Sequence, residues 1–395
     1  MSNITEKSDK YFMPNYQRLP VCLVRGENAT AYDETGKRYI DFGAGIGVNS
    51  LGYCDGEWVK AIAEQAAEIQ HVSNYYYSLP GAELAEKLCL ETGYKKVLLQ
   101  NSGAEANECA FKLARKYSFD KHGGDSGRNV ILSLSNSFHG RTLATLTATG
   151  QEAFHNYFFP FPGGFIYTAP NDTAEFRQTL ADNPGICAVV LEFIQGEGGV
   201  LPLDADYVET VFALCREKDI LIIADEVQTG VGRTGKFLSA EHYGVQPDIV
   251  TLAKGLGGGL PIGAVLAAEN CCDVLSSGTH GTTFGGNPVV CAGASYVLDK
   301  IFSDGFLAGV SEKGRIIKAK LDSLEENGIV SDVFVRGLMI GFVPLKKTAA
   351  AVKDTAAENG LLVLTAKDRV RLLPPLTISD AELSSGLDIL TGVLL

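Results

Sequence analysis

The sequence lacks the features of several large protein classes. In its 395 residues, no uninterrupted apolar run approaches the ~18 residues that cross a membrane. The segment from Met1 to Lys7 does not combine a basic region with an apolar one, so no secretory signal is expected. Low-complexity segments, internal repeats and obvious flexible linkers are also missing. These absences predict a cytoplasmic globular protein without a membrane partner.

Metal-ligand spacings and an excess of positive charge are absent too. Neither Cys-x-x-Cys nor His-Glu-x-x-His occurs, and the six histidines are dispersed, so no metal site is expected. The nine cysteines are an odd number with only Cys271 and Cys272 close together, which indicates reduced thiols. The 34 basic and 47 acidic residues give a net charge of −13, which disfavours nucleic acid as a partner.

Apolar residues are plentiful enough for a large core, at 46% of the chain. At ~150 residues per domain, the length predicts two or three domains. Short apolar runs alternate with longer helical segments through the middle of the chain. The runs are residues 97–99, 130–132, 165–167, 188–191, 221–223, 250–252 and 264–266. Such alternation is typical of an α/β fold with a mostly parallel sheet covered on both faces.

The two ends of the chain follow a different pattern. Residues 21–24 and 38–42, with a turn at 33–36, predict a hairpin, and the pattern after residue 293 predicts a small α+β unit. We therefore expect residues 51–293 to form the large domain. Residues 1–50 and 294–395 are expected to form one smaller α+β domain together.

A lysine and an aspartate stand at the ends of two predicted buried strands. Lys254 follows the apolar run 249–253 and precedes the glycine-rich segment 255–259, and Asp225 ends the run 220–224. Ligands of such sheets bind beyond the carboxyl ends of the strands. A buried amine can form an imine with an aldehyde, and a carboxylate can keep a heteroaromatic nitrogen protonated, which together describe a pyridoxal phosphate site. The alternative is a surface lysine and a helix-capping aspartate.

Further residues at strand ends supply the other parts of such a site. Ser102 opens a helix whose free N–H groups can bind a phosphate, although Ser102 and Glu105 also form a capping box. Phe138 can stack on a planar ring and Arg141 can bind a carboxylate, or they are a core phenylalanine and a surface arginine. Glu197 lies in a glycine-rich loop. A nucleotide site at residues 255–259 is excluded, because the lysine and hydroxyl ending of a phosphate loop is missing.

Six motifs, in this order along the chain, resemble those of class III pyridoxal phosphate-dependent aminotransferases. They are residues 101–107, 138–141, 225–230, 254–255, 282–288 and 371–375. The resemblance covers nearly the whole chain and implies the aspartate aminotransferase fold, which is pyridoxal phosphate fold type I. Within the family, residues 15–20 and 253–264 resemble bacterial acetylornithine aminotransferases.

The resemblance implies roles for matching residues around the cofactor ring. Lys254 would be the Schiff-base lysine and proton shuttle, and Asp225 would pair with the pyridine nitrogen. Phe138 and Val227 would sandwich the ring, and Gln228 would bond its phenolic oxygen.

The family also implies a phosphate site shared between two subunits. Ser102, Gly103 and Ala104 would hold the phosphate, joined by Thr283 of a second subunit. This contact implies a homodimer with composite active sites.

The substrate-binding residues follow from the same resemblance. Arg141 would bind the carboxylate distal to the reacting amine, and Tyr16 would contribute to the pocket. Glu197 and Arg371 would form a gate, paired for an ω-amine and opened when the α-carboxylate of glutamate needs Arg371. Ile46 stands where ornithine aminotransferases carry a tyrosine for the α-amino group, which favours a substrate with that nitrogen acylated.

The expected reaction transfers the δ-amino group of N2-acetylornithine to 2-oxoglutarate, giving N-acetylglutamate 5-semialdehyde and glutamate in arginine biosynthesis. Succinylornithine, ornithine, succinyldiaminopimelate and 4-aminobutyrate are alternative donors for the same chemistry. An intramolecular aminomutase would not need the gate, and a catalytically silent homologue would not need Lys254. Two positions depart from the family pattern, Phe193 in place of proline and the segment 52–56, and both put local loop geometry in doubt.

Overall fold

A computed structural model describes residues 3–395, and its centre is a seven-stranded sheet. The strand order is β4-β12-β11-β10-β7-β5-β6, and only β12 runs antiparallel to its neighbours. The strands are β4 (Lys96–Gln100), β5 (Val130–Leu134), β6 (Phe165–Thr168), β7 (Ile186–Leu191), β10 (Leu221–Asp225), β11 (Ile249–Leu252) and β12 (Gly263–Ala267). All seven apolar runs are strands of this sheet, so the predicted α/β fold class is confirmed.

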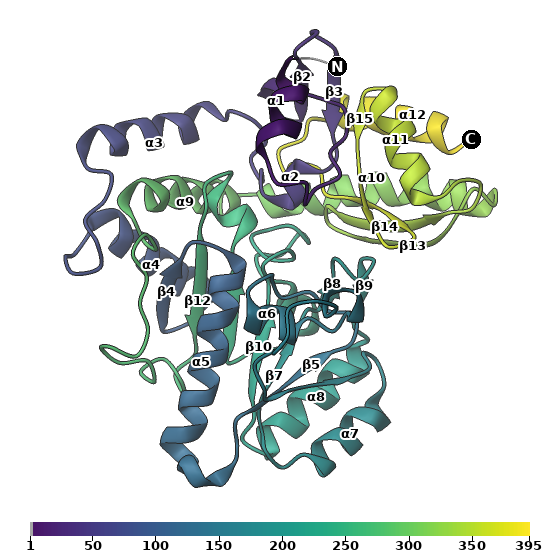
Figure 1. The fold of residues 1–395 in the computed structure, drawn as a ribbon. Coiled ribbons are helices and arrows are strands. Elements are labelled where there is room, and N and C mark those ends of the chain that lie inside the picture. Colours follow the sequence, from purple (N-terminus) through teal and green to yellow (C-terminus); the bar gives the residue numbers. More distant parts are fainter. Residues whose placement is uncertain (1–2) are drawn as a thin grey trace.

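Helices on both faces of the sheet explain why its strands are continuously apolar. Figure 1 shows α5 (Gly103–His122) against one part of the sheet and α7 (Thr173–Asp182) and α8 (Ala205–Glu217) against another. Ile222 packs in the same core as Tyr207 of α8, whereas the next residue, Ile223, packs with Phe111 of α5. Each successive side chain is therefore buried against a helix, which removes the polar alternation of a one-sided sheet.

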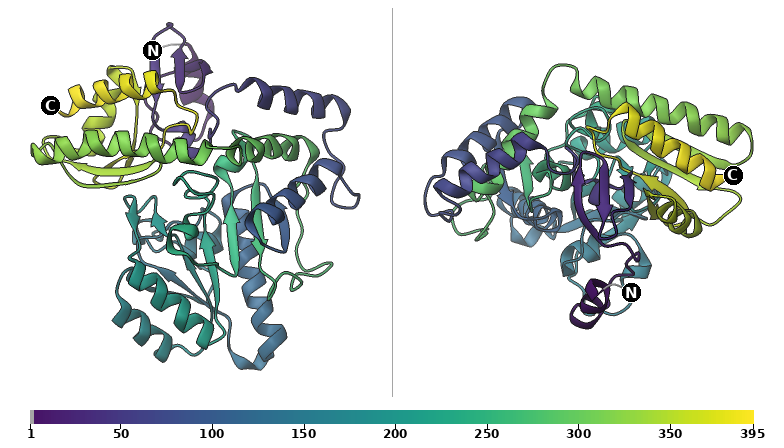
Figure 2. Two further views of the ribbon diagram at one scale, coloured as in Figure 1. Left: turned by 180° about the vertical axis from the view of Figure 1, so that it is seen from behind. Right: turned by 90° about the horizontal axis from the view of Figure 1, so that it is seen from above.

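Segments from the two ends of the chain form two further four-stranded sheets. One has the order β1-β2-β3-β15, and the other has the order β13-β14-β17-β16. Their strands are β1 (Leu23–Glu27), β2 (Thr30–Asp33), β3 (Arg38–Asp41), β13 (Val330–Arg336), β14 (Met339–Pro344), β15 (Leu361–Leu362), β16 (Leu364–Ala366) and β17 (Arg369–Leu372). The predicted turn at 33–36 joins β2 to β3, and β3 pairs in parallel with β15. Figure 2 shows the N- and C-terminal segments on the same side of the large sheet.

The remaining helices connect and cover these sheets. They are α1 (Asn3–Tyr11), α2 (Ala44–Gly47), α3 (Gly56–Glu68), α4 (Leu79–Thr92), α6 (Leu143–Ala148), α9 (Pro288–Ile301), α10 (Phe306–Glu326), α11 (Ala349–Glu358) and α12 (Asp380–Leu394). A short hairpin of β8 (Ile194–Gln195) and β9 (Leu201–Pro202) follows β7. Among residues 3–395, no helix is both long and apolar enough to span a bilayer.

The two departures from the family pattern have a local structural basis. Phe193 is fully buried, and its ring stacks on Tyr243 with 5.1 Å between the centroids. In the segment 52–56, Cys54 has a positive φ of 55°, and Asp55 caps α3 by accepting a hydrogen bond from the Trp58 N–H. Apolar stacking at the first position and a helix cap at the second therefore hold these loops.

Candidate active site

The carboxyl ends of several central strands surround one cavity of about 450 Å³. Its lining includes most of the residues that the sequence singled out: Ser102, Gly103, Ala104, Phe138, Arg141, Glu197, Asp225, Val227, Gln228 and Lys254. Arg371 reaches the cavity through its contact with Glu197. Tyr16 and Thr283 do not line it, and Tyr16 is 71% exposed with Arg18 over its ring. The structure therefore brings together all the predicted site residues except these two.

Lys254 begins the short 3-10 helix η4 (Lys254–Gly257) immediately beyond β11. Its φ is +40°, a left-handed conformation that is strained for any residue except glycine. Burial lowers the pKa of the Lys254 amine, which outweighs the opposing charge of Glu197. The lysine is thus held at a strand end where the uncharged, nucleophilic amine is more accessible than in a solvated lysine.

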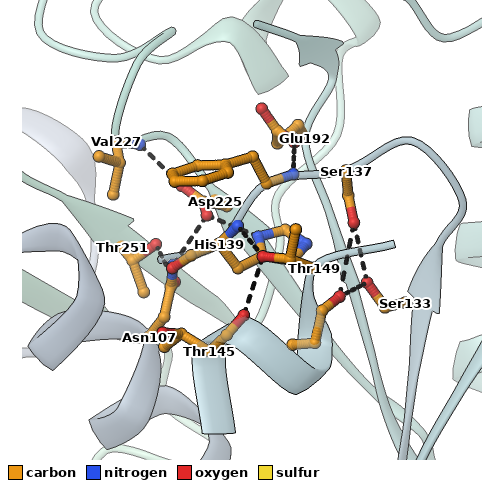
Figure 3. Close-up of polar contacts among 12 residues, drawn as sticks. Asn107, Ser133, Ser137, His139, Thr145, Thr149, Glu192, Asp225, Val227 and Thr251 are labelled. Atoms are coloured by element: carbon orange, nitrogen blue, oxygen red, sulfur yellow. Dashed lines mark hydrogen bonds and ion pairs between the residues drawn. The ribbon is translucent and has the colours of Figure 1, made fainter. Parts of the chain in front are cut away.

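Asp225 is fixed by hydrogen-bond donors on three sides, as Figure 3 shows. Its Oδ2 accepts from Asn107 Nδ2 at 2.8 Å and from His139 Nδ1 at 2.7 Å. Among residues 3–395, the Val227 N–H is the only donor to its Oδ1, at 3.0 Å, which leaves a lone pair for one more donor. Asn107 is itself oriented by Thr251, whose Oγ1 donates to Asn107 Oδ1 at 2.8 Å.

His139 and Asn107 are site residues to which the sequence gave no role. Burial alone would lower the pKa of His139, but the hydrogen bond to Asp225 and the charges of Asp225 and Glu192 outweigh it and raise the pKa. The charged form of His139 is therefore more accessible than that of a solvated histidine, and its hydrogen bond stabilises the Asp225 carboxylate. His139 lies in the motif 138–141 and Asn107 in the motif 101–107, and this membership was the only sign in the sequence that they belong to the site.

The turn after β4 combines free helix N–H groups with a close packing contact. Ser102 is the N-cap of α5, and its Oγ accepts from the Glu105 N–H at 3.2 Å, so the capping alternative is real. A Cβ on Gly103 would lie 2.7 Å from Val227 Cγ1, so only glycine allows this approach. Cap and anion site are compatible because the first N–H groups of a helix point outward along its axis.

The gate residues are paired in this structure. Arg371 Nη1 lies 2.6 Å from Glu197 Oε1 and donates to Gln228 Oε1 at 3.1 Å. Burial would raise the pKa of Glu197, but the Arg371 charge and hydrogen bond hold it below its usual range. Arg371 Nε is buried and has no hydrogen-bond partner among the described residues. It is a ready donor for a carboxylate once Glu197 moves.

Arg141 and Glu192 complete the lining of the cavity. Arg141 is exposed, with its guanidinium 4.2 Å from the centroid of the Phe154 ring, so it is held at the cavity mouth by stacking. Glu192 follows β7 and is 4% exposed. Its burial raises the pKa to about 7, although the charge of His139 opposes this shift.

These features fit pyridoxal phosphate. Asp225 Oδ1 has a free lone pair for a ring N–H, the α5 turn suits a phosphate, and Lys254 faces the same cavity from η4. No group of three or more His, Cys, Asp or Glu side chains in residues 3–395 is arranged to hold a metal ion. The α/β fold and this site define a pyridoxal phosphate-dependent aminotransferase of fold type I. The chain belongs to the aminotransferase class-III family, whose model matches residues 11–394.

Similar proteins span almost the full chain. An acetylornithine aminotransferase of Haemophilus ducreyi is 47% identical, covering 99% of this chain and 98% of its own length. A succinylornithine transaminase of Yersinia pseudotuberculosis is 43% identical over 98% of this chain and 95% of its own. The ornithine aminotransferase structure of Toxoplasma gondii has a TM-score of 0.94 and 31% identity, covering 99% of this chain and 94% of that one. The N-acetylornithine aminotransferase structure of Stenotrophomonas maltophilia has a TM-score of 0.85 and 37% identity, covering 98% of both chains.

Proposed function

We propose that this enzyme transfers the δ-amino group of N2-acetylornithine to 2-oxoglutarate, in the cytoplasm, as a step of arginine biosynthesis. The observation that carries the proposal is the Glu197–Arg371 pair at 2.6 Å on the cavity, in which Arg371 Nε finds no hydrogen-bond partner within residues 3–395. An arginine that is paired with a glutamate suits an enzyme that alternates between two substrates. The ω-amine donor does not need the arginine, whereas the dicarboxylate acceptor binds it. Curated relatives named acetylornithine aminotransferase, at 43–47% identity, support the choice of donor.

When bound, pyridoxal phosphate supplies an aldehyde that captures the amine and a ring that withdraws electrons as the adjacent C–H bond breaks. The α5 turn and Phe138 would hold its phosphate and its ring, with Val227 opposite. Asp225, oriented by His139 and Asn107, would keep the ring nitrogen protonated.

The remaining residues handle protons and substrate charge. Lys254 Nζ, whose pKa is lowered by burial, would take the proton from the donor carbon that carries the amine. In the second half-reaction it would deliver a proton to the α-carbon of the new glutamate. Glu197 would cover Arg371 while the ω-amine donor is bound. In the second half-reaction, the α-carboxylate of 2-oxoglutarate, which becomes that of glutamate, would displace Glu197 and bind Arg371. Arg141 would bind the distal carboxylate.

Ile46, an apolar residue two positions before Val48 of the cavity lining, is consistent with an acylated donor. Ile46 lies in α2 with a positive φ of 65°, an unusual backbone conformation for a β-branched residue. Its side chain is 43% exposed and offers no partner for a charged α-ammonium. Succinylornithine is the second candidate donor, because relatives at 43% identity carry the name succinylornithine transaminase. Ornithine, succinyldiaminopimelate and 4-aminobutyrate stay alternatives with less support.

We also propose that the enzyme is a homodimer in which Thr283 completes the phosphate site of the partner subunit. Thr283 is exposed, and beside it lies an aromatic surface formed by Tyr75, Tyr76, Tyr77 and Phe284, which are 94%, 74%, 107% and 62% exposed. Asn74 joins the two segments by donating to the Thr282 and Gly285 carbonyls, both at 3.1 Å. Contiguous apolar patches of this kind mark interfaces in soluble proteins.

The division into domains is a further part of the proposal. Pairing of β3 with β15 ties residues 1–50 to residues 294–395, which supports one small domain built from both ends of the chain. Residues 51–293 would form the large domain with the cofactor site.

The donor is tested by stopped-flow absorbance of the purified enzyme without a keto acid. The spectral change of the bound cofactor is followed with N2-acetylornithine, succinylornithine, ornithine and 4-aminobutyrate in separate experiments. We expect fast conversion by N2-acetylornithine and conversion by ornithine slower by at least about tenfold, since the apolar side chain of Ile46 offers no partner for a charged ammonium. Faster conversion by ornithine or 4-aminobutyrate would contradict the donor assignment and leave the aminotransferase chemistry intact.

A further inference from the structure

Glu192 is a buried carboxylate that the proposed mechanism leaves without a role. It follows β7 directly, is 4% exposed, and lines the cavity with Phe138 and Asp225. A carboxylate in such a place is costly unless hydrogen bonds compensate for the lost water. The hydrogen-bond partners of its two oxygens therefore indicate the role of this side chain.

Each oxygen of Glu192 accepts a backbone N–H from a different loop of the site. Oε1 accepts from the Phe138 N–H at 2.9 Å, and Figure 3 shows this bond from the carboxylate to a backbone nitrogen. Oε2 accepts from the Gly196 N–H at 3.1 Å. The first loop carries the ring-stacking Phe138, and the second carries Glu197 directly after Gly196. One side chain thus links the cofactor-stacking loop to the gate loop.

The main chain at Glu192 is anchored from outside the cavity. The next residue, Phe193, is fully buried and stacks on Tyr243 at 5.1 Å, with an angle of 26° between the rings. Tyr243 is held in turn, because its hydroxyl donates to the Leu203 carbonyl at 2.7 Å. The carboxylate therefore projects from a fixed point, as a positioning group must.

The gate loop has little freedom to move without disturbing the gate. A Cβ on Gly196 would lie 2.2 Å from Gln228 Oε1, so the backbone already touches the amide of Gln228. Gln228 contacts both gate residues, with Nε2 at 3.4 Å from Glu197 Oε1 and Oε1 at 3.1 Å from Arg371 Nη1. A small shift of Gly196 would change the Glu197–Arg371 pairing.

We propose that Glu192 is a positioning residue that fixes the loop of Phe138 and the loop of Glu197 relative to each other, through one N–H bond to each. It sets the stacking of the cofactor ring and the closed state of the gate from a single buried carboxylate. This inference rests on the proposed function, because it takes Phe138 as the stacking residue and Glu197 as the gate.

The test is the substitution Glu192→Gln in the cofactor-loaded enzyme. Glutamine has only one acceptor oxygen, and its NH₂ group would face the second N–H donor, so at least one loop loses its anchor. Visible circular dichroism of the bound cofactor reports the stacking loop, and the glutamate-to-ω-amine ratio of kcat/KM reports the gate loop. We expect an altered dichroic band with about tenfold weaker cofactor binding, or a ratio raised at least about fivefold by a freed Arg371.

Glu382→Gln is the matched control. Glu382 is also buried, at 9% exposure, and also accepts backbone N–H groups from two segments, Ala29 at 3.1 Å and Ser379 at 3.0 Å, away from the cavity. It is expected to lower the thermal unfolding temperature without changing the dichroic band or the ratio. If Glu192→Gln leaves both readouts at their wild-type values, or changes them no more than the control does, the inference is wrong.

Two further choices keep this experiment decisive. If Glu192→Gln does not fold, Glu192→Asp takes its place, because its shorter side chain cannot keep both oxygens within reach of the two N–H groups, and it must show at least one of the two effects. The ω-amine used is the one that the wild-type enzyme prefers in the donor series. A wrong donor assignment therefore appears in the wild-type data alone, separately from any failure of the Glu192 inference.

Discussion

At the residue scale, the strand-end pattern located Lys254 and Asp225, and the structure places both on one cavity. Their roles toward the cofactor stay predictions. The sequence gave no role to the residues that hold Asp225, because His139 reaches it from a loop 86 residues away and Asn107 from α5, 118 residues away. A hydrogen bond between distant segments leaves no local periodicity, and an isolated histidine is equally compatible with an ordinary core. Burial and contact geometry are needed to distinguish these cases.

The His139–Asp225 pair predicts a pH-dependent contribution to stability. Because the pKa of His139 is raised in the folded protein, the pair stabilises fully below the ordinary imidazole value of about 6.5. The stabilisation is lost as the pH rises through the higher folded-state value. His139→Asn removes the charge, and we expect it to cost about 1–3 kcal/mol at pH 6 and less at pH 9. Thermal unfolding of both proteins at these two pH values measures the difference.

Comparison of the two proteins isolates the contribution of this histidine. Lys254 titrates in both proteins, so its contribution largely cancels in the difference, whereas the charge interaction between His139 and Glu192 is part of what the difference measures. A cost of His139→Asn that is the same at pH 6 and pH 9 would mean that the imidazole is neutral in the folded enzyme. Asp225 would then be stabilised by its neutral donors alone.

At the element scale, burial decides which strands a sequence reveals. The strands β7, β10, β11 and β12 are buried along their whole length, so each is a continuous apolar run. The two-residue strand β15 pairs in parallel with β3, whose sequence is more than 300 residues away, and it is too short for any pattern. The hairpin predicted from residues 21–24 and 38–42 falls on β1 and β3, but β2 lies between them and pairs with both. The small sheets were therefore predicted only in part, whereas the central sheet was predicted strand by strand.

The α5 turn predicts a steric test of the phosphate site. Gly103→Ala puts a Cβ 2.7 Å from Val227 Cγ1, so the turn or the Val227 side chain must shift. We expect a loss of about 1–3 kcal/mol of stability, together with weaker cofactor binding, because the overpacking lies between two residues that are proposed to contact the cofactor. Cofactor affinity, from quenching of protein fluorescence on titration with pyridoxal phosphate, and the thermal unfolding temperature are measured together.

Gly309→Ala provides the matched control for this change. Gly309 also lies in the first turn of a helix, α10, but no atom stands within 4 Å of its added Cβ. The same substitution there is expected to leave cofactor binding unchanged and to raise stability by up to about 1 kcal/mol. Equal effects of the two substitutions would show that helix propensity, and not the contact with Val227, controls the response.

At the scale of the whole molecule, two predicted site residues lie apart from the cavity within one chain. Thr283 faces outward beside the aromatic surface, and Tyr16 is 71% exposed. The family resemblance assigned Thr283 to a partner subunit, and its exposure supports that proposal. Contacts between two chains leave no periodicity in the sequence of either chain. Thr283 was therefore predicted from the family motif at residues 282–288 and not from a hydrophobic pattern.

The aromatic surface predicts that assembly and cofactor binding are coupled. Phe284→Glu introduces a charge at a residue 62% exposed in the single chain and adjacent to Thr283, so it should oppose dimer formation while leaving the fold intact. We expect sedimentation equilibrium to show a monomer, and pyridoxal phosphate to bind at least about tenfold more weakly because the partner's phosphate contact is lost.

Phe119→Glu is the control, since Phe119 has the same 62% exposure but lies in the last turns of α5, away from Thr283. A Phe284→Glu enzyme that stays dimeric would show that this surface is not the interface. A monomer that binds the cofactor as tightly as the wild type would remove Thr283 from the phosphate site.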